Sequence, residues 1–314
     1  MWFNLMGNMP EKFDRKLIKS GAYSRYLDFH NLMKFRIRDI LLVSSMYDSY
    51  IFEEDGRLYE LIRSEYQGLN LSHSPELMQV SSGEDALELA LNENRFNLIL
   101  VTLHIEDMKS VTFAKKAREA GIKIPIVLLG YDNFEMTEIL SREDTSCFDK
   151  IFIWQGDFRL IVGIIKYLED MLNVEDDTKR IGVQSIIVIE DNILFYSSYL
   201  PLIYNAILTQ SQGLISEGIN LSHKFLRMRA RPKILLCSNY EEAWNYFEKY
   251  KDCILGVITD LAFTKDGLMN ENAGMEFAAS VKAEDSDIPI LLQSNHPDIE
   301  KMAASLSIHY LKKD

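Results

Sequence analysis

The stretch SIIVIEDN at residues 185–192 decides the fold, because an unbroken apolar run is followed directly by Glu190 and Asp191. A run without polar alternation is typical of a parallel strand that is covered on both faces. A second strand of this kind, LGVITD at 255–260, also ends in an acid, Asp260. Because parallel strands end at one edge of a sheet, we expect the three carboxylates to converge there.

The same alternation of short apolar runs and helical segments extends outward from this stretch. Further strands are expected at KILLCS (233–238), PILLQS (289–294) and SIHYL (307–311), with a long helical connection over 193–231. In the other direction the pattern repeats with strands at 39–45, 76–82, 97–102, 124–130 and 150–154, and with helices at 48–67, 83–94, 109–120, 133–141 and 157–172. Such βα alternation predicts doubly wound parallel sheets.

The predicted fold class is α/β, with two five-stranded, doubly wound, flavodoxin-like domains in tandem and an N-terminal helical extension. We place the extension at 1–35, the first domain at 36–174, a linker at 175–183 and the second domain at 184–314. The linker assignment depends on NVEDDTKRIG, which is acidic and then basic. The fifth strand of the second domain ends near Leu311, so we expect that domain to be truncated before its last helix.

Composition narrows the function classes. No apolar run approaches the roughly 20 residues that span a bilayer, and residues 1–10 lack a signal-peptide pattern, so we expect a cytoplasmic protein with no membrane association. A formal net charge of −13 argues against nucleic acid as a partner. The three cysteines, Cys147, Cys237 and Cys253, lack metal-site spacing and are expected to be buried free thiols.

The acidic trio Glu190, Asp191 and Asp260 also predicts a cofactor. Carboxylates this close repel one another and raise their own pKa values unless a cation lies among them, and oxygen ligands suit Mg²⁺. Ser294 and Lys313 follow two further strands. A lysine ammonium offsets charge on a phosphoryl group and a serine hydroxyl donates to one of its oxygens, so Asp260 is the expected nucleophile.

At this point a family resemblance emerges. The segments IIVIEDN, VITDLAF, IPILLQS and HYLKK resemble the receiver (CheY-like) domains of two-component response regulators, over residues 184–314. The resemblance implies that a sensor histidine kinase or a phosphotransfer protein is the partner and that Mg²⁺ is the cofactor. It also implies a role for each matching residue: metal ligation by Glu190, Asp191, Asp260 and the backbone carbonyl of Ala262, phosphoacceptance by Asp260, phosphate binding by Ser294 and Lys313, and switching by Ser294 and Tyr310.

Two departures from the family pattern matter for these assignments. Lys313 is preferred over Lys312 because Tyr310 lies three residues before it, although Asp314 replaces the proline that usually follows the lysine. The loop TKDGLMNENAGME at 264–276 is longer than the family's and lacks its proline, and the next helix is expected to start near Gly274.

The corresponding positions of the first domain carry none of this chemistry. They are Ser44 and Ser45 for the acidic pair, Thr102 for the phosphoacceptor, Gly130 for the hydroxyl and Trp154 for the lysine. This domain therefore resembles a pseudo-receiver, which implies a docking or dimerisation role without phosphorylation. Its His104, Glu106 and Asp107 lie just beyond Thr102, but adjacent acids on a loop are usually solvated, so we expect no metal site there.

The strings RDILLVSSMYDSYIFEEDGRLYE and LISEGINLSHKFLRMRARPKILL are similar to the N-terminal region of bacterial proteins that continue into a phosphoenolpyruvate (PEP) synthase or pyruvate phosphate dikinase-like module. By that resemblance a catalytic module that binds ATP and PEP or pyruvate follows Asp314, and this chain is the regulatory part of an ATP-dependent pyruvate/PEP phosphotransferase.

The basic run KFLRMRARPK, with Arg227, Arg229, Arg231 and Lys233, is interpreted as a solvated helix end before a strand rather than as a nucleotide contact. Three functional classes stay open for the whole chain. They are a phosphorylation switch, a constitutive protein-interaction scaffold without phosphotransfer, and a metal-dependent phosphohydrolase. A homodimer is compatible with each of them.

Overall fold

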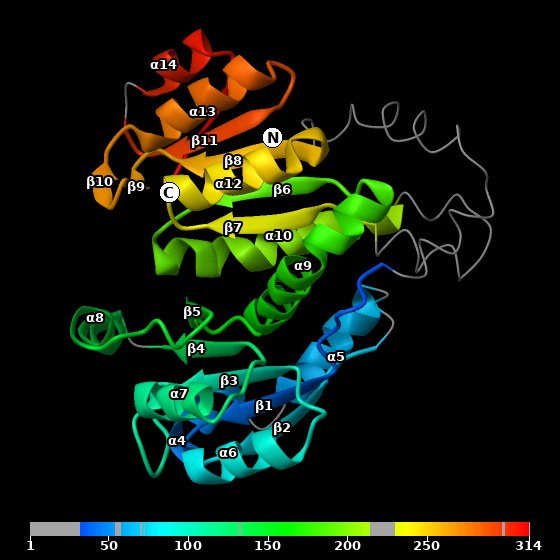
Figure 1. Cartoon of the computed structure of the whole chain (residues 1–314), viewed down its shortest axis with the longest axis vertical. Coiled ribbons are helices and arrows are strands. Elements are labelled where there is room, and N and C mark those ends of the chain that lie inside the picture. The colour runs from blue at the N-terminus through cyan, green and yellow to red at the C-terminus, as the bar shows by residue number, and fades with distance from the viewer. Residues whose placement is uncertain are drawn as a thin grey trace, which may run out of the picture.

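The computed structural model describes residues 32–53, 58–69, 71, 73–131, 133–213, 230–296 and 299–313. The predicted helical extension at 1–35 lies outside the described residues except for 32–35, which are not helical. Within the described part, two five-stranded parallel sheets each carry helices on their faces (Figure 1). The predicted tandem α/β fold is therefore confirmed.

The first unit contains β1 Asp39–Val43, α4 Met46–Glu53, α5 Leu58–Gly68, β2 Glu76–Val80, α6 Gly83–Asn92, β3 Leu98–Thr102, α7 Ser110–Glu119, β4 Ile126–Gly130, α8 Asn133–Arg142, β5 Lys150–Ile153 and α9 Arg159–Ile181. Its strand order is β2-β1-β3-β4-β5, and all neighbours are parallel. Two helices, α4 and α5, stand where the sequence predicts one over 48–67.

The second unit contains β6 Ser185–Ile189, α10 Ile193–Gly213, β7 Lys233–Cys237, α12 Tyr240–Tyr250, the short 3₁₀ helix Lys251–Cys253, β8 Ile254–Asp260, β9 Phe263–Lys265, β10 Leu268–Asn270, α13 Ala273–Glu284, β11 Ile290–Ser294, α14 Ile299–Ser305 and β12 His309–Lys312. Its main sheet has the order β7-β6-β8-β11-β12, again all parallel. Both sheets therefore follow the 2-1-3-4-5 order of flavodoxin-like folds.

The long loop that the sequence places after Asp260 forms a small antiparallel hairpin of β9 and β10. Its turn contains Asp266 and Gly267, which both have positive φ angles of 52° and 76°. Two consecutive positive φ values are typical of the turns that connect two-stranded hairpins, and an Asp-Gly pair tolerates them. Sequence reasoning predicted the extra length but not the hairpin.

The segment predicted as a linker, 175–183, is helical as far as Ile181 and forms the end of α9. Ion pairs at i,i+4 spacing, Glu175 with Lys179 and Asp176 with Arg180, support the helix surface there. Gly182 ends the helix in the left-handed conformation, with φ 67°. The acidic and basic residues that suggested a linker are therefore part of a continuous helix, in which Glu175, Lys179 and Arg180 are exposed and Asp177 is buried.

Helices α9 and α10 lie between the two sheets (Figure 1). One apolar cluster joins side chains from both sheets to these helices and to α5, and it includes Leu42, Ile164, Val188 and Tyr204. The outer face of the first sheet packs on α6 and α7, and that of the second sheet packs on α12, α13 and α14. The two units thus share one buried helical layer. In the part of the chain that the structure describes, no helix has both the length and the apolar character needed to cross a bilayer.

The edge strand β5 of the first unit is also bonded to the second unit. The backbone N–H of Ile153 donates to Ser197 Oγ at 3.0 Å, and the Tyr196 hydroxyl donates to the carbonyl of Ile151. Lys150 Nζ donates to Ser238 Oγ, 2.9 Å away at the end of β7. These polar contacts and the shared apolar cluster connect the units through α10 and β7.

Two residues of the basic run are buried, which corrects the interpretation of that run as a solvated helix end. Arg231 makes a bidentate pair with Asp170 of α9, with both N–O distances at 2.8 Å. Lys233 Nζ lies 2.8 Å from an oxygen of Asp177, and all four side chains are at most 1% exposed. Buried charges require partners, and α9 supplies them. Arg227 and Arg229 lie outside the described residues.

Of the three cysteines, Cys147 and Cys237 are buried free thiols, as predicted, while Cys253 is only partly buried.

Candidate functional site

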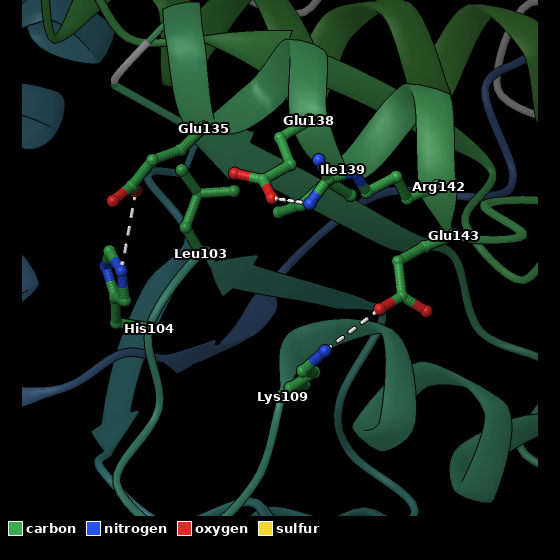
Figure 2. Close-up of a pocket in the computed structure, with 8 residues that line it drawn as sticks. All are labelled: Leu103, His104, Lys109, Glu135, Glu138, Ile139, Arg142 and Glu143. Carbon is green, nitrogen blue, oxygen red and sulfur yellow. Dashed lines mark hydrogen bonds and ion pairs between the residues drawn. The ribbon is translucent and has the colours of Figure 1, made fainter.

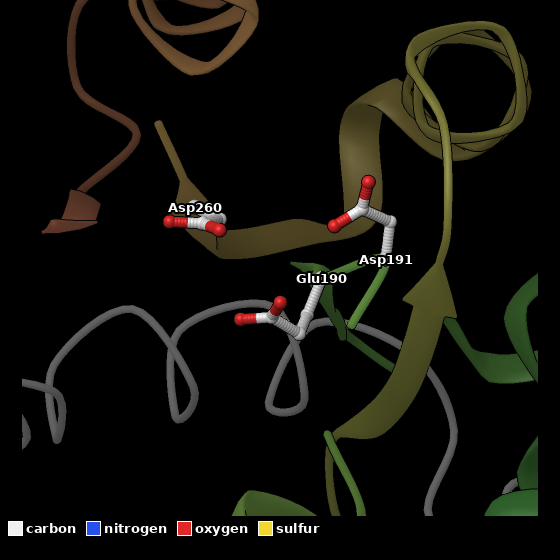
Figure 3. A group of neighbouring side chains, drawn as sticks. All are labelled: Glu190, Asp191 and Asp260. Atoms are coloured by element: carbon white, nitrogen blue, oxygen red, sulfur yellow. The ribbon is translucent and has the colours of Figure 1, made fainter. Parts of the chain in front are cut away.

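Three carboxylates meet at the C-terminal edge of the second sheet. Glu190 and Asp191 directly follow β6, and Asp260 ends β8, the strand that pairs with β6. One oxygen from each side chain lies within 4.8 Å of the other two (Figure 3). Strands β6 and β8 flank the switch point of the 2-1-3-4-5 order, where ligands of open α/β sheets bind. The predicted convergence of the trio therefore occurs.

The electrostatics of the trio are unfavourable to three negative charges. Glu190 is 1% exposed, and burial raises its pKa to about 7, an effect that Lys313 opposes and Asp260 reinforces. Burial and the nearby Asp260 also raise the pKa of Asp191. Removal from water and mutual repulsion both favour the neutral acids. A cation placed among the carboxylates would relieve both penalties.

The donor set fits a hard divalent cation. Within the described ranges, these three residues are the only group of at least three acidic, histidine or cysteine side chains close enough to share an ion. All the donors are carboxylate oxygens, which Mg²⁺ prefers, and Asp191 and Asp260 are only partly buried, so retained waters have access. Ala262, whose carbonyl is the fourth predicted ligand, lies between β8 and β9. The position of its carbonyl relative to an ion stays a prediction.

Lys313 contributes the positive charge of the site. Its Nζ donates to Glu190 Oε2 at 2.6 Å and to Asp260 Oδ2 at 2.9 Å. Burial alone would lower the pKa of Lys313, but the bonds to the two carboxylates raise it overall. Lys312 is exposed, whereas Lys313 is 8% exposed. Of the two candidate lysines, the structure therefore brings Lys313 to the carboxylates.

Ser294 and Tyr310 lie on the neighbouring strands β11 and β12. Gln293 is opposite Asp260 in the sheet register, so Ser294 lies one residue further towards the carboxyl edge. The Ser294 hydroxyl oxygen accepts from the N–H of His296 at 3.1 Å, which leaves its hydrogen to be donated elsewhere. The Tyr310 hydroxyl donates to the Ser294 carbonyl at 2.8 Å. The two predicted switch residues are therefore directly bonded.

The backbone around Asp260 is tightly held. Its Oδ1 accepts from the N–H of Leu261 at 2.8 Å. Gly274, in the first turn of α13, lies so close that a Cβ there would be 2.0 Å from the carbonyl oxygen of Asp260. Helix α13 begins at Ala273, next to the start predicted at Gly274. Only glycine allows the helix to approach the strand end this closely.

Among the residues that the structure describes, no acidic trio lies at the matching edge of the first sheet. Thr102 is fully buried, and its hydroxyl donates to the carbonyl of His104 at 2.9 Å. The N–H of Trp154 donates to the Gly130 carbonyl, just as the N–H of Lys313 donates to the Ser294 carbonyl. Trp154 therefore occupies the position equivalent to Lys313, as the sequence alignment predicts. Neither a carboxylate nor an ammonium lies at the aligned positions of this sheet.

Sequence reasoning missed a different polar cluster at this edge. The buried carboxylate of Asp48 accepts from the Tyr131 hydroxyl and from the backbone N–H of His104, each at 3.1 Å, and Nδ1 of His104 is 3.3 Å away. On the other side of the ring, Nε2 lies 3.4 Å from Glu135. Because the carboxylates of Asp48 and Glu135 face opposite ring nitrogens, they cannot ligate one ion together. No sequence signal beyond an acid early in a helix pointed to Asp48.

A pocket of about 290 Å³ adjoins His104, between α8 and the loop after β3 (Figure 2). It is lined by Leu103, His104, Lys109, Glu135, Glu138, Ile139, Arg142 and Glu143. Lys109 pairs with Glu143 and Arg142 pairs with Glu138, so these charges compensate one another, while the His104 ring faces Glu135. Asp107 is engaged elsewhere, at the N-terminus of α6, where it accepts from the N–H groups of Gly83 and Glu84.

Comparisons with known proteins give similarity to solved structures alone, since no family model and no curated protein matches the chain. The chain is similar to a protein described as a two-component system response regulator/GGDEF domain protein, with 14% identity and a TM-score of 0.37 over 88% of this chain and 91% of that one. It is similar to the signal receiver domain of a Luxo repressor protein from Vibrio parahaemolyticus, with 12% identity and a TM-score of 0.33 over 45% and 96%. It is also similar to the phosphorylated cyanobacterial phytochrome response regulator RcpA, with 19% identity and a TM-score of 0.31 over 43% and 93%. At these scores the likenesses carry no argument about function.

Proposed function

We propose that this chain is a phosphorylation-dependent signalling module of the two-component type, in which Asp260 accepts a phosphoryl group. The observation that carries the proposal is the convergence of Glu190, Asp191, Asp260 and Lys313 at the switch point of the second sheet. Three carboxylates with one ammonium provide an acceptor oxygen, oxygen ligands for a divalent cation and a positive charge for the phosphoryl oxygens. The solved receiver structures are consistent with this reading of the fold.

The chemistry is transfer of a phosphoryl group from a phosphohistidine of the partner. An oxygen of the Asp260 carboxylate attacks phosphorus, a P–O bond forms and the P–N bond breaks. The imidazole leaves with the electron pair of that bond and takes up a proton from water. Bound Mg²⁺, held by Glu190, Asp191 and Asp260, would neutralise charge on the transferred group. Lys313 and Ser294 would bind the phosphoryl oxygens, and the bonded pair Ser294 and Tyr310 would report the change.

We further propose that the first unit is a pseudo-receiver with a docking or dimerisation role. The positions aligned with the acidic pair and the acceptor hold serines and a buried threonine, which offer neither carboxylate ligands nor an anionic acceptor.

The partner proposed for the second unit is a sensor histidine kinase or a phosphotransfer protein. The connection to a PEP synthase or pyruvate phosphate dikinase-like module is also a proposal, and it rests on the sequence resemblance alone. The gene sequence on either side of the region encoding this chain tests it.

The test is Mg²⁺-dependent binding of beryllofluoride, which mimics the phosphoryl group. Isothermal titration calorimetry and amide NMR measure this binding. Wild type should bind saturably, and Asp260→Ala should not. The matched control is Asp252→Ala, since Asp252 is exposed at the opposite end of β8 and should leave binding unchanged. Incubation with acetyl phosphate should add one phosphoryl mass to the wild type and to Asp252→Ala, and none to Asp260→Ala. If wild type binds no beryllofluoride, the chain is better explained as a scaffold without phosphotransfer.

A further inference from the structure

The Lys313 ammonium has three neighbours, not only the two carboxylates. Besides Glu190 and Asp260, the ring of Phe195 lies beneath it, with Nζ 4.0 Å from the ring centroid. The lysine side chain is 6% exposed, so water contributes little to its solvation. A distance of 4.0 Å is well inside the range of about 6 Å for cation–π attraction, which strengthens when the cation is desolvated.

Glu190 cannot keep its full hydrogen bond to Lys313 and ligate a metal at the same time. The ammonium lies among the acids, bonded to Glu190 and Asp260, and its shorter bond is to Glu190. Once Glu190 ligates a metal, that bond must weaken or break, because the carboxylate charge is then shared with a divalent ion. Lysine is long and flexible, and the loss of its closest partner would release its side chain. Something else must then keep the ammonium beside Asp260.

The position of Phe195 allows its ring to keep the Lys313 ammonium beside Asp260. Phe195 lies in the first turn of α10, which begins at Ile193, and it follows Asp191 by four residues, so the ring and a metal-ligand candidate are close along the chain. The ring stacks on Tyr199, one further turn along, with a centroid distance of 6.0 Å and an interplanar angle of 15°. Tyr199 therefore supports the Phe195 ring that meets Lys313.

We propose that Phe195 is a positioning residue for Lys313, whose ring face holds the ammonium beside Asp260 when Glu190 serves as a metal ligand. The inference rests on the proposed function of Asp260 as a phosphoacceptor. A positioning role for Phe195 differs from a packing role in one measurable respect. A ring that only fills space is needed equally with and without a phosphoryl group, whereas a ring that positions Lys313 matters chiefly when the phosphoryl oxygens require the ammonium.

The experiment compares Phe195→Leu, Phe195→Tyr and Tyr199→Leu with wild type. Isothermal titration calorimetry measures the Kd for Mg²⁺ alone and then the Kd for beryllofluoride at saturating Mg²⁺. Phe195→Leu should weaken beryllofluoride binding about tenfold, the loss expected for one desolvated cation–π contact. It should change the Mg²⁺ Kd less than about twofold, since Phe195 offers no metal ligand. Phe195→Tyr keeps the ring and should restore wild-type binding, while Tyr199→Leu should have the smaller effect of a supporting residue.

Lys313→Met adds an independent measurement of the competition between Lys313 and a metal for Glu190. Without the internal ammonium, Mg²⁺ should bind more tightly and beryllofluoride more weakly. The inference is overturned if Phe195→Leu binds beryllofluoride like wild type, if it weakens both ligands equally, or if Phe195→Tyr fails to rescue. A wild type that binds no beryllofluoride would instead overturn the phosphoacceptor function of Asp260, and the inference with it.

Discussion

Replacing Asp170 with alanine should destabilise the chain more than any change at the acidic site, because Asp170 is the central partner of a buried charge cluster. Its two oxygens accept from both terminal nitrogens of Arg231 at 2.8 Å, from the Tyr204 hydroxyl at 2.8 Å and from the N–H of Ile234 at 3.0 Å. The side chain is fully buried, as is that of Lys233, 3.7 Å away. Loss of the carboxylate leaves the buried cations of Arg231 and Lys233 without the counterion that they share.

The magnitude follows from that geometry. Breaking one partner of a buried ion pair costs about 3 to 5 kcal/mol, since the remaining charge stays desolvated. The bidentate pair and the two further donors place Asp170→Ala well inside that range, at about 4 kcal/mol. An exposed pair between the same helix and α12, Glu175 with Lys249, contributes about 0 to 1 kcal/mol. Glu175→Ala is therefore the matched control.

The assay is urea unfolding, followed by circular dichroism and by tryptophan fluorescence. Because Asp170 joins α9 of the first unit to β7 of the second, its loss should also separate one transition into two. The double variant Asp170→Ala with Arg231→Met removes the unpaired charge and should recover part of the loss. A cost for Asp170→Ala below about 1 kcal/mol, or equal to that of Glu175→Ala, would refute the reasoning.

Two further predictions concern the acidic site. The pKa of Glu190 in the folded protein is raised to about 7 from its ordinary value of 4.5. Its contribution to the stability of the protein without Mg²⁺ is therefore fully present below pH 4.5 and is lost as pH rises through 7. Glu190→Gln should gain stability relative to wild type between pH 5 and pH 8, and equal pH dependence in urea unfolding would contradict this. Gly274→Ala should destabilise the chain by about 1 to 3 kcal/mol and weaken Mg²⁺-dependent beryllofluoride binding, because its Cβ would meet the Asp260 carbonyl oxygen at 2.0 Å. Gly68→Ala, with nothing within 4 Å of its Cβ, is the control and should be close to neutral in both measurements.

The fold was predictable because its signals are local. Each strand is a short apolar run and each run is followed by a helical pattern, so ten parallel strands could be placed from the sequence alone. The boundary between the units was harder. Residues 175–181 carry charges that suit either a linker or the exposed face of a helix, and the choice depends on contacts with a segment far along the chain.

The residues of the two sheet edges likewise divide into those that the sequence predicts and those that it does not. Glu190, Asp191 and Asp260 were predictable because strand ends meet at one edge, and their position in the sequence fixes their position in the sheet. Phe195 and Asp48 were not, since an aromatic or an acid in the first turns of a helix is common and carries no distinctive pattern. Their roles depend on which side chains face them across the sheet edge, and sequence spacing does not contain that information.

The basic run before β7 illustrates the limit most clearly. Charges in a sequence window usually indicate solvent exposure, and by that rule both the run containing Arg231 and the end of α9 containing Asp177 look solvated. The rule fails here because each segment supplies the countercharge of the other, and the partners Asp170 and Arg231 are 61 residues apart. An acidic segment and a basic segment that flank the same strand pair are therefore better treated as a candidate buried pair than as two exposed surfaces. The unfolding of Asp170→Ala measures which description holds.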